Sequence, residues 1–268
     1  MILDPLNSSS SDEGLLFVAT GSTYLEEAFY AARASKSFLG DHPIAIVTDL
    51  HSECKSMNIF DLVLPHPCPI YSYRDKIPPL LNLPWRKTLF LDTDACLTSE
   101  VDSIFSSLGH SHLAAAFAPV RHPSGWNDSS VPLLFPEINS GVLLLRRSFR
   151  QRMLVKKWLK LYDQLFFRYD QSWDQASLRS VIWDMKKFWW LRFSNLPAEA
   201  NLRLTKPWVA GKGLAVHVIH GRVPPNEFDS FLQYLNGDID RFRHWHEWLT
   251  LYPDSALRPK ISPQPTIF

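Results

Sequence analysis

Short apolar runs alternate with segments of helical periodicity along the first part of the chain. Residues 15–20 form an apolar run that ends at Gly21, and apolar positions then recur at the spacing of an amphipathic helix. Residues 43–48 form a second apolar run, which is rich in β-branched residues and is closed by Asp49. Because the order strand, helix, strand favours a parallel sheet, we predict an α/β fold in which helices flank a mostly parallel central sheet.

The rest of the chain shows the same two patterns and two helix-start motifs. Ser99 with Asp102, and Ser172 with Gln175, have the spacing of a capping box. The proline-rich segment 119–136 is a long loop and a candidate lid. Further strands are predicted over 62–64, 88–91, 112–118, 138–145 and 215–219, and helices over 73–83, 149–169 and 239–251, with one helix after each capping box.

Composition bounds the architecture and the partners. The chain has 268 residues, of which 46% are hydrophobic and 21% charged, and its formal net charge is +1. This length suits one domain, and the balanced charge lacks the basic footprint of a nucleic-acid-binding protein. We expect a flexible tail over 1–13, one domain over 14–225, and a helical extension over 226–268 that packs on it.

The location of the protein is predicted from what its sequence lacks. The first residues do not have the charged and apolar regions of a signal peptide. No apolar run approaches the roughly 18 residues that a transmembrane helix needs. The three cysteines lack the spacing of a zinc or redox pair, which indicates free thiols in a reducing compartment. We therefore expect a cytoplasmic protein without a transmembrane segment.

Two acids, Asp92 and Asp94, stand directly after the apolar run that ends at Leu91. Carboxylates at positions i and i+2 can converge on one hard divalent cation, which would stabilise both charges beside a core. They could instead accept hydrogen bonds from turn amides, as short acids often do. Their position favours the metal interpretation, because open α/β sheets bind ligands at the carboxyl ends of their strands.

Five short motifs follow one another in an order that is more specific than any one of them. They are Tyr73-Arg-Asp-Lys76, Leu89-Phe-Leu-Asp-Thr-Asp94, Pro136-Glu-Ile-Asn-Ser-Gly-Val142, Asp174-Gln175 and Ile219-His-Gly-Arg222. With these motifs the chain resembles the nucleotide-diphospho-sugar transferases of the GT-A fold. Glycosyltransferase family 8 and its bacterial relatives are the nearest match, and the resemblance runs from about Gly14 to about Arg222.

The resemblance implies a Rossmann-like GT-A domain that transfers a sugar from a UDP-sugar to a hydroxyl of a carbohydrate or other acceptor, with retention at the anomeric carbon. It implies Mn²⁺ or Mg²⁺ held by Asp92, Asp94 and His220, with His217 as the rival of His220. The implied catalytic residues are Asp174, Asn139 and Gln175, and the implied donor contacts are Thr20, Gly21, Tyr24, Asp49, Arg74, Lys76, Asp92, Thr93, Gly141 and Arg222.

Some of these residues have a simpler interpretation or depart from the family pattern. From its residue type alone, Lys76 is expected to be a solvated surface charge. Gln175 is in part a capping residue. The family pattern continues past its histidine to a Lys-Pro-Trp, whereas here Lys206-Pro207-Trp208 precedes His220. The lysine that would contact the phosphates is therefore unassigned.

Two other functions are compatible with the acidic pair. A haloacid dehalogenase-like phosphatase also places such a pair after an apolar strand and uses the first acid, here Asp92, as its nucleophile. In that fold the pair follows the first core strand and a Thr or Val stands two residues on, whereas here two strand and helix units precede the pair and Cys96 holds that position. The third possibility is a nucleotide-sugar-binding module without turnover.

Overall fold

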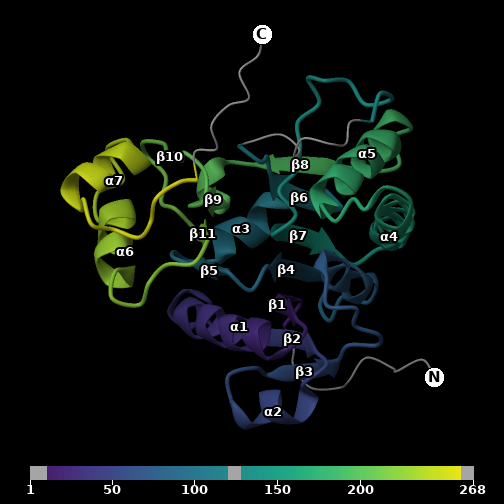
Figure 1. Ribbon diagram of the computed structural model, residues 1–268, viewed down its shortest axis with the longest axis horizontal. Coiled ribbons are helices and arrows are strands. Elements are labelled where there is room, and N and C mark those ends of the chain that lie inside the picture. The colour runs from purple at the N-terminus through teal and green to yellow at the C-terminus, as the bar shows by residue number, and fades with distance from the viewer. Residues whose placement is uncertain (1–10, 120–127, 261–268) are drawn as a thin grey trace.

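A seven-stranded sheet runs through the centre of the computed structural model, which describes residues 11–119 and 128–260 (Figure 1). The strands follow the order β3, β2, β1, β4, β7, β6, β8. Only β7 is antiparallel to its neighbours in this sheet, so the predicted mostly parallel α/β sheet is confirmed. The strands are β1 (Glu13–Ala19), β2 (Ile44–Thr48), β3 (Leu62–Pro65), β4 (Lys87–Leu91), β6 (Leu113–Ala116), β7 (Val142–Arg146) and β8 (Phe193–Leu196).

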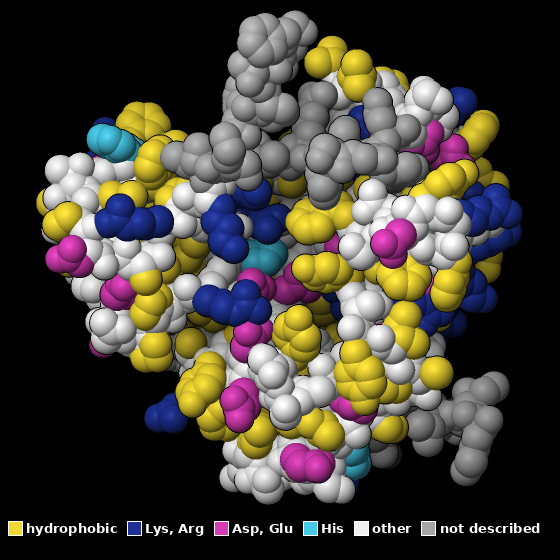
Figure 2. Space-filling model, in the orientation of Figure 1, with side chains coloured by type: hydrophobic (Ala, Val, Ile, Leu, Met, Phe, Trp, Pro, Cys, Tyr) yellow, Lys and Arg dark blue, Asp and Glu magenta, His cyan; other side chains and the backbone are white. Residues whose placement is uncertain are grey.

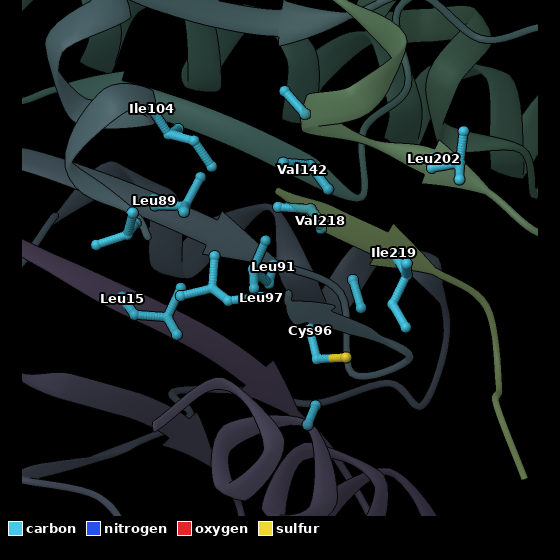
Figure 3. Packing of buried hydrophobic residues seen from close by; sticks show 14 of the residues in the cluster. Leu15, Leu89, Leu91, Cys96, Leu97, Ile104, Val142, Leu202, Val218 and Ile219 are labelled. Atoms are coloured by element: carbon cyan, nitrogen blue, oxygen red, sulfur yellow. The ribbon is translucent and has the colours of Figure 1, made fainter. Parts of the chain in front are cut away.

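Each face of the sheet has its own hydrophobic core, because successive side chains of a strand point to opposite faces. On one face Leu15 and Phe17 of β1 pack with α1 and α3, and Figure 3 shows part of this core. On the other face Leu16 and Val18 pack with α4 and α5. These helices are α1 (Ser22–Ser35), α3 (Asp102–Ser107), α4 (Phe149–Tyr169) and α5 (Asp174–Lys187), while α2 (His51–Ser56) precedes β3.

A small second sheet brings a distant segment beside the Asp92–Asp94 turn. β5 (Ala95–Leu97) pairs with β11 (Val218–His220), and β11 pairs with β9 (Leu202–Arg203). The register places His220 opposite Ala95, the residue that directly follows Asp94. The fold therefore brings a histidine and two acids together although they are far apart in the sequence.

The last described segment packs on the same core as α1. α6 (Phe228–Asn236) and α7 (Trp245–Leu251) lie together at one side of the molecule (Figure 1) and contribute the buried rings of Phe231 and Trp248, whose centroids are 4.9 Å apart. A two-stranded pairing of β10 (Val209–Ala210) with β12 (Arg243–His244) joins this segment to the preceding loop. None of the described helices combines the length and apolar composition that crossing a membrane requires.

Several predicted elements differ from the observed ones. The predicted helix over 73–83 is two short 3-10 helices, η2 (Tyr73–Lys76) and η3 (Pro78–Leu81), since Pro78 and Pro79 cannot donate the backbone hydrogen bonds of a longer helix. The remaining 3-10 helices are η1 (Lys36–Phe38) and η4 (Ala198–Ala200). The predicted helix over 239–251 begins only at Trp245, because residues 243–244 pair as β12.

Both capping boxes are wrong. α3 begins after Val101 and α5 begins after Trp173, and neither of these N-cap residues caps its helix through a side chain. Strand β1 begins at Glu13, which is the last residue of the predicted tail over 1–13. The helix over 149–169 is confirmed with its predicted bounds. Part of the predicted loop over 119–136 lies outside the described residues.

Candidate active site

A cleft of about 440 Å³ lies at the carboxyl ends of β1 and β4. Figure 2 shows it as a hollow near the centre of this face, where histidine, acidic and basic side chains gather. Twelve of the predicted site residues line it: Thr20, Tyr24, Lys76, Asp92, Thr93, Asp94, Asn139, Gly141, Asp174, Gln175, His220 and Arg222. The five sequence motifs therefore meet in one place.

Asp92, Asp94 and His220 offer three ligand atoms that all lie within 4.8 Å of one another. His220 Nε2 is 3.4 Å from Asp94 Oδ1 and 3.9 Å from Asp92 Oδ2. On the other side of the ring, Nδ1 lies 3.0 Å from Asn201 Oδ1. An amide oxygen can only accept, so Nδ1 donates to it and Nε2 is the ring nitrogen that faces the acids. Two carboxylates and one such imidazole fit a divalent cation, and Mn²⁺ accepts this mixed set.

The backbone around the acids leaves no room for a side chain at Gly141. The Asp92 N–H donates to the Gly141 carbonyl at 2.7 Å, which holds the end of β4 against the start of β7. A Cβ at Gly141 would lie 2.2 Å from His220 Cε1 and 2.6 Å from Asp92 Oδ2. Both distances are far below van der Waals contact, so glycine at this position is what lets the histidine and the acid approach each other.

Lys76 is a buried cation between two acids and not the surface charge expected from its residue type. Its side chain Nζ donates to Asp92 Oδ1 and Oδ2, both at 3.2 Å, and lies 3.0 Å from Asp174 Oδ2. It also donates to Ser140 Oγ at 3.2 Å. Burial lowers the pKa of Lys76, but the charges of Asp174 and Asp92 outweigh burial and raise it. Lys76 therefore stays charged and ties the Asp92 turn to the start of α5.

Asp94 is ionised at neutral pH because its neighbours are positive. Burial raises the pKa of Asp94, but the interaction with His220 and the charges of Arg222 and Arg203 outweigh burial and hold the pKa well below its usual range. Arg222 Nη1 lies 3.9 Å from Asp94 Oδ2, and its Nε donates to Glu27 at 2.7 Å. An ionised carboxylate is the form that binds a cation.

The side of the cleft near α5 carries amide groups that can contact hydroxyls. Asn139 is buried, and its Oδ1 accepts from the Gly141 N–H at 2.9 Å. Its Nδ2 finds no hydrogen-bond partner among the described residues, so it is a donor available to a ligand. Gln175 Nε2 donates to Glu137 Oε1 at 3.3 Å, and Arg203 Nη1 lies 3.5 Å from Gln175 Oε1.

Three predicted donor contacts, Gly21, Asp49 and Arg74, are not among the residues that line the cleft. Asp49 supports one wall, because it accepts from the Gly21 N–H at 2.9 Å and from the Tyr71 hydroxyl at 3.0 Å. Arg74 faces α4, where its Nε and Nη2 donate to the two oxygens of Asp163 at 2.6 and 3.0 Å. His217 lies outside the cleft beside the carbonyl of Glu100, so of the two histidines only His220 faces the acids.

The cleft also contains residues that the sequence analysis did not assign. Arg203 and Lys206 line it, and Lys260 joins them because its backbone N–H donates to the Thr205 carbonyl at 3.0 Å. Lys206 belongs to the Lys-Pro-Trp sequence that precedes His220, so the fold brings this lysine to the cleft in spite of its changed position in the sequence. For Asn201 and Arg203 no local pattern gave a signal, since their position depends on the pairing of β9 with β11.

Comparison with known proteins supplies an independent view of the fold. No protein-family model matches the chain, and no curated protein matches it. Among solved structures, an active-site mutant of LgtC is 14% identical over 79% of this chain and 88% of LgtC, with a TM-score of 0.52. Galactosyltransferase LgtC with donor and acceptor sugar analogues is 13% identical over 79% of this chain and 87% of that one, with a TM-score of 0.50.

Two larger glycosyltransferases are also similar. The bifunctional glycosyltransferase WbbM is 11% identical over 75% of this chain and 41% of its own, with a TM-score of 0.50. GlyE of Streptococcus pneumoniae is 18% identical over 72% of this chain at a TM-score of 0.49, and the match spans 48% of its length.

The chain has a GT-A fold. The fold prediction is therefore confirmed, and the resemblance to family 8 in particular remains a prediction. Within this GT-A fold the Asp92–Asp94 turn follows β4, a central strand that lies next to β1 in the sheet.

Proposed function

We propose that this protein is a metal-dependent glycosyltransferase that moves a sugar from a nucleoside-diphosphate sugar, with UDP as the nucleotide, to an acceptor hydroxyl. The observation that carries the proposal is the convergence of Asp92, Asp94 and the Nε2 atom of His220 inside a cleft of a GT-A fold. The presence of Lys206 and Arg222 in the lining of the same cleft supports it, because a diphosphate needs cations around it.

The chain's own residues supply most of the proposed chemistry. Asp92, Asp94 and His220 would hold Mn²⁺ or Mg²⁺, and the bound cation would offset the negative charge on the departing diphosphate. Arg203, Lys206, Arg222 and Lys260 line the cleft and would share that charge. Positive groups fixed before the reaction stabilise a leaving group without reorganising during it.

The contacts of Asp174 and Glu137 support retention of configuration at the anomeric carbon. An inverting enzyme would need a carboxylate free to take a proton from the acceptor hydroxyl. Asp174 lies 3.0 Å from the Lys76 ammonium, and Glu137 Oε1 accepts from Trp173 and Gln175. Since both acids are held by donors, we assign Asp174, with Asn139 and Gln175, to orienting the sugar and the acceptor. Nuclear magnetic resonance of the first-formed product tests this, because an inverted anomeric centre would contradict it.

A panel of nucleotide sugars with and without Mn²⁺ tests the function directly. We expect release of the nucleoside diphosphate from one UDP-sugar, dependent on the metal and lost in Asp94→Ala. Absence of turnover with every donor, together with binding of UDP, would indicate the non-catalytic module. Metal-dependent hydrolysis of a generic phosphate monoester, lost in Asp92→Asn, would indicate the phosphatase.

The cytoplasm remains our proposed location. Cys54, Cys68 and Cys96 are all free thiols in the structure, which suits a reducing compartment.

A further inference from the structure

A second surface combines exposed aromatic rings with basic side chains. It lies where α4 begins and α5 ends, and we call it the α4–α5 surface. At the right-hand edge of Figure 2, basic side chains (dark blue) and hydrophobic side chains (yellow) are interleaved. Its members are the aromatic residues Phe149, Phe188, Trp189 and Trp190 and the basic residues Arg146, Arg150, Lys157, Lys186, Lys187 and Arg192.

The aromatic side chains of this surface are exposed, and the backbone that carries two of them is held by hydrogen bonds. Trp189 is 88% exposed and Phe188 is 61% exposed. Arg150 Nη1 lies 3.3 Å from the Trp189 carbonyl and 3.4 Å from that of Trp190, which fixes the turn after α5. Beside the turn is a groove of about 160 Å³ lined in part by Met153, Phe188 and Trp190. Exposed apolar residues that gather in one patch with polar residues around it mark an interaction surface.

The charge of this surface is strongly one-sided. Residues 146–162 contain seven Lys or Arg and residues 185–195 contain three, and neither segment contains Asp or Glu. Six of these ten belong to the α4–α5 surface, although the net charge of the chain is only +1. Arg146 and Arg192 lie beside the same residue, because the Arg146 N–H donates to the His112 carbonyl at 3.0 Å and the Arg192 N–H donates to His112 Nδ1 at 2.9 Å. Asp184 is an acid in the lining of the groove and lies 4.0 Å from Lys157.

The α4–α5 surface lies at the end of the sheet opposite the cleft. Arg146 ends the antiparallel strand β7, and Arg192 directly precedes β8, which is parallel to β6. The cleft is at the carboxyl ends of β1 and β4, which run in the same direction as β6. A partner on this surface would therefore leave the cleft open.

We propose that the α4–α5 surface docks the protein on an anionic membrane surface. Trp side chains are enriched at the level of lipid headgroups, and basic residues are attracted to anionic lipids. Trp189 and Phe188 would enter the headgroup layer while Lys186 and Lys187 contact the lipid charges. A second copy of this chain fits the surface poorly, because the same cations would face each other.

Sedimentation of the full chain with lipid vesicles tests the proposal. We expect binding to vesicles of phosphatidylcholine mixed with phosphatidylserine, weaker binding to phosphatidylcholine alone, and a loss of binding as salt screens the charges. One basic residue near an anionic surface contributes about fivefold to binding, so Lys186→Gln with Lys187→Gln should weaken it about 25-fold. Trp189→Asn should weaken vesicle binding further, because it removes the ring that would enter the headgroup layer. Asparagine is the replacement because it tolerates the left-handed backbone at this position, where φ is 59°.

The control removes two exposed cations elsewhere. Lys36→Gln with Lys55→Gln takes the same charge from α2 and the end of α1, so this variant should bind vesicles like the unchanged protein. The proposal is overturned if the unchanged protein fails to bind anionic vesicles or if both double variants bind equally. Binding of single-stranded RNA, or self-association in the ultracentrifuge, that is lost with Lys186 and Lys187 while vesicles are ignored would assign the surface to that other partner instead.

Discussion

The substitution Gly141→Ala tests the metal site separately from the stability of the fold. The new Cβ would lie 2.2 Å from His220 Cε1 and 2.6 Å from Asp92 Oδ2, whereas ordinary contact begins at 3.4 Å. The imidazole must therefore retreat by about 1.2 Å and the carboxylate by about 0.8 Å, the differences between these distances. Metal-ligand distances tolerate changes of only about 0.2 Å, so His220 and Asp92 cannot both remain ligands.

We expect Gly141→Ala to weaken Mn²⁺ binding by about 100-fold, which is the upper end of the loss of affinity seen when the support of a metal ligand is disturbed. Overpacking should also lower the free energy of unfolding by about 1–3 kcal/mol, or several degrees in the melting temperature. Titration of the protein with MnCl₂, followed by the electron paramagnetic resonance signal of free Mn²⁺, measures the affinity. Thermal unfolding measures the stability.

Gly14→Ala is the matched control, because it makes a comparable clash far from the cleft. Its Cβ would lie 2.6 Å from Cδ2 of the buried Trp85. This variant should lose stability to a similar degree and keep its Mn²⁺ affinity. If Gly141→Ala binds Mn²⁺ as tightly as the unchanged protein, or if both variants lose affinity equally, the placement of the metal between Asp92 and His220 is refuted.

Three further predictions follow from single contacts. Lys76→Met should lower the free energy of unfolding in urea by about 3–5 kcal/mol, because it leaves the buried Asp174 and the half-buried Asp92 without their cation. The exposed pair of Arg86 with Asp12 should contribute less than about 1 kcal/mol. His220→Ala should weaken Mn²⁺ binding and His217→Ala should not, and the reverse order in calorimetry would show the wrong histidine was chosen. Burial raises the pKa of Cys54 to about 11 and of Cys96 to about 12, so a thiol reagent at pH 8 should modify one cysteine per native chain, the exposed Cys68, and three after unfolding.

Several strands and the position of the acidic pair were predictable because their signals are local. A run such as 88–91 is buried on both faces and ends in acids, and that pattern is visible without any neighbour. The position of this run in the sheet indicated a ligand site, because open α/β sheets bind ligands at the carboxyl ends of their strands. The helix over 149–169 was predictable from its helical periodicity, and the structure shows that Ser148 caps its start, where its side chain accepts from the Gln151 N–H at 3.1 Å.

Other features depend on residues that are distant in the sequence. Lys76 resembles a surface lysine until the fold places Asp92 and Asp174 on two sides of it. Arg74, two residues earlier, pairs with Asp163 of α4 instead of lining the cleft. Asn201 holds the His220 ring only because β9 pairs with β11. Spacing along the chain carries no information about such partners, so these roles became visible only in the structure.

The most direct test of the metal site is the position of Mn²⁺ in crystals grown with MnCl₂ and UDP. Anomalous scattering locates manganese independently of any interpretation of the surrounding density. The account predicts one strong peak between the carboxylates of Asp92 and Asp94 and the Nε2 atom of His220, with the diphosphate of UDP on its open side. Manganese at another place, or UDP bound with no peak between these three residues, would contradict it.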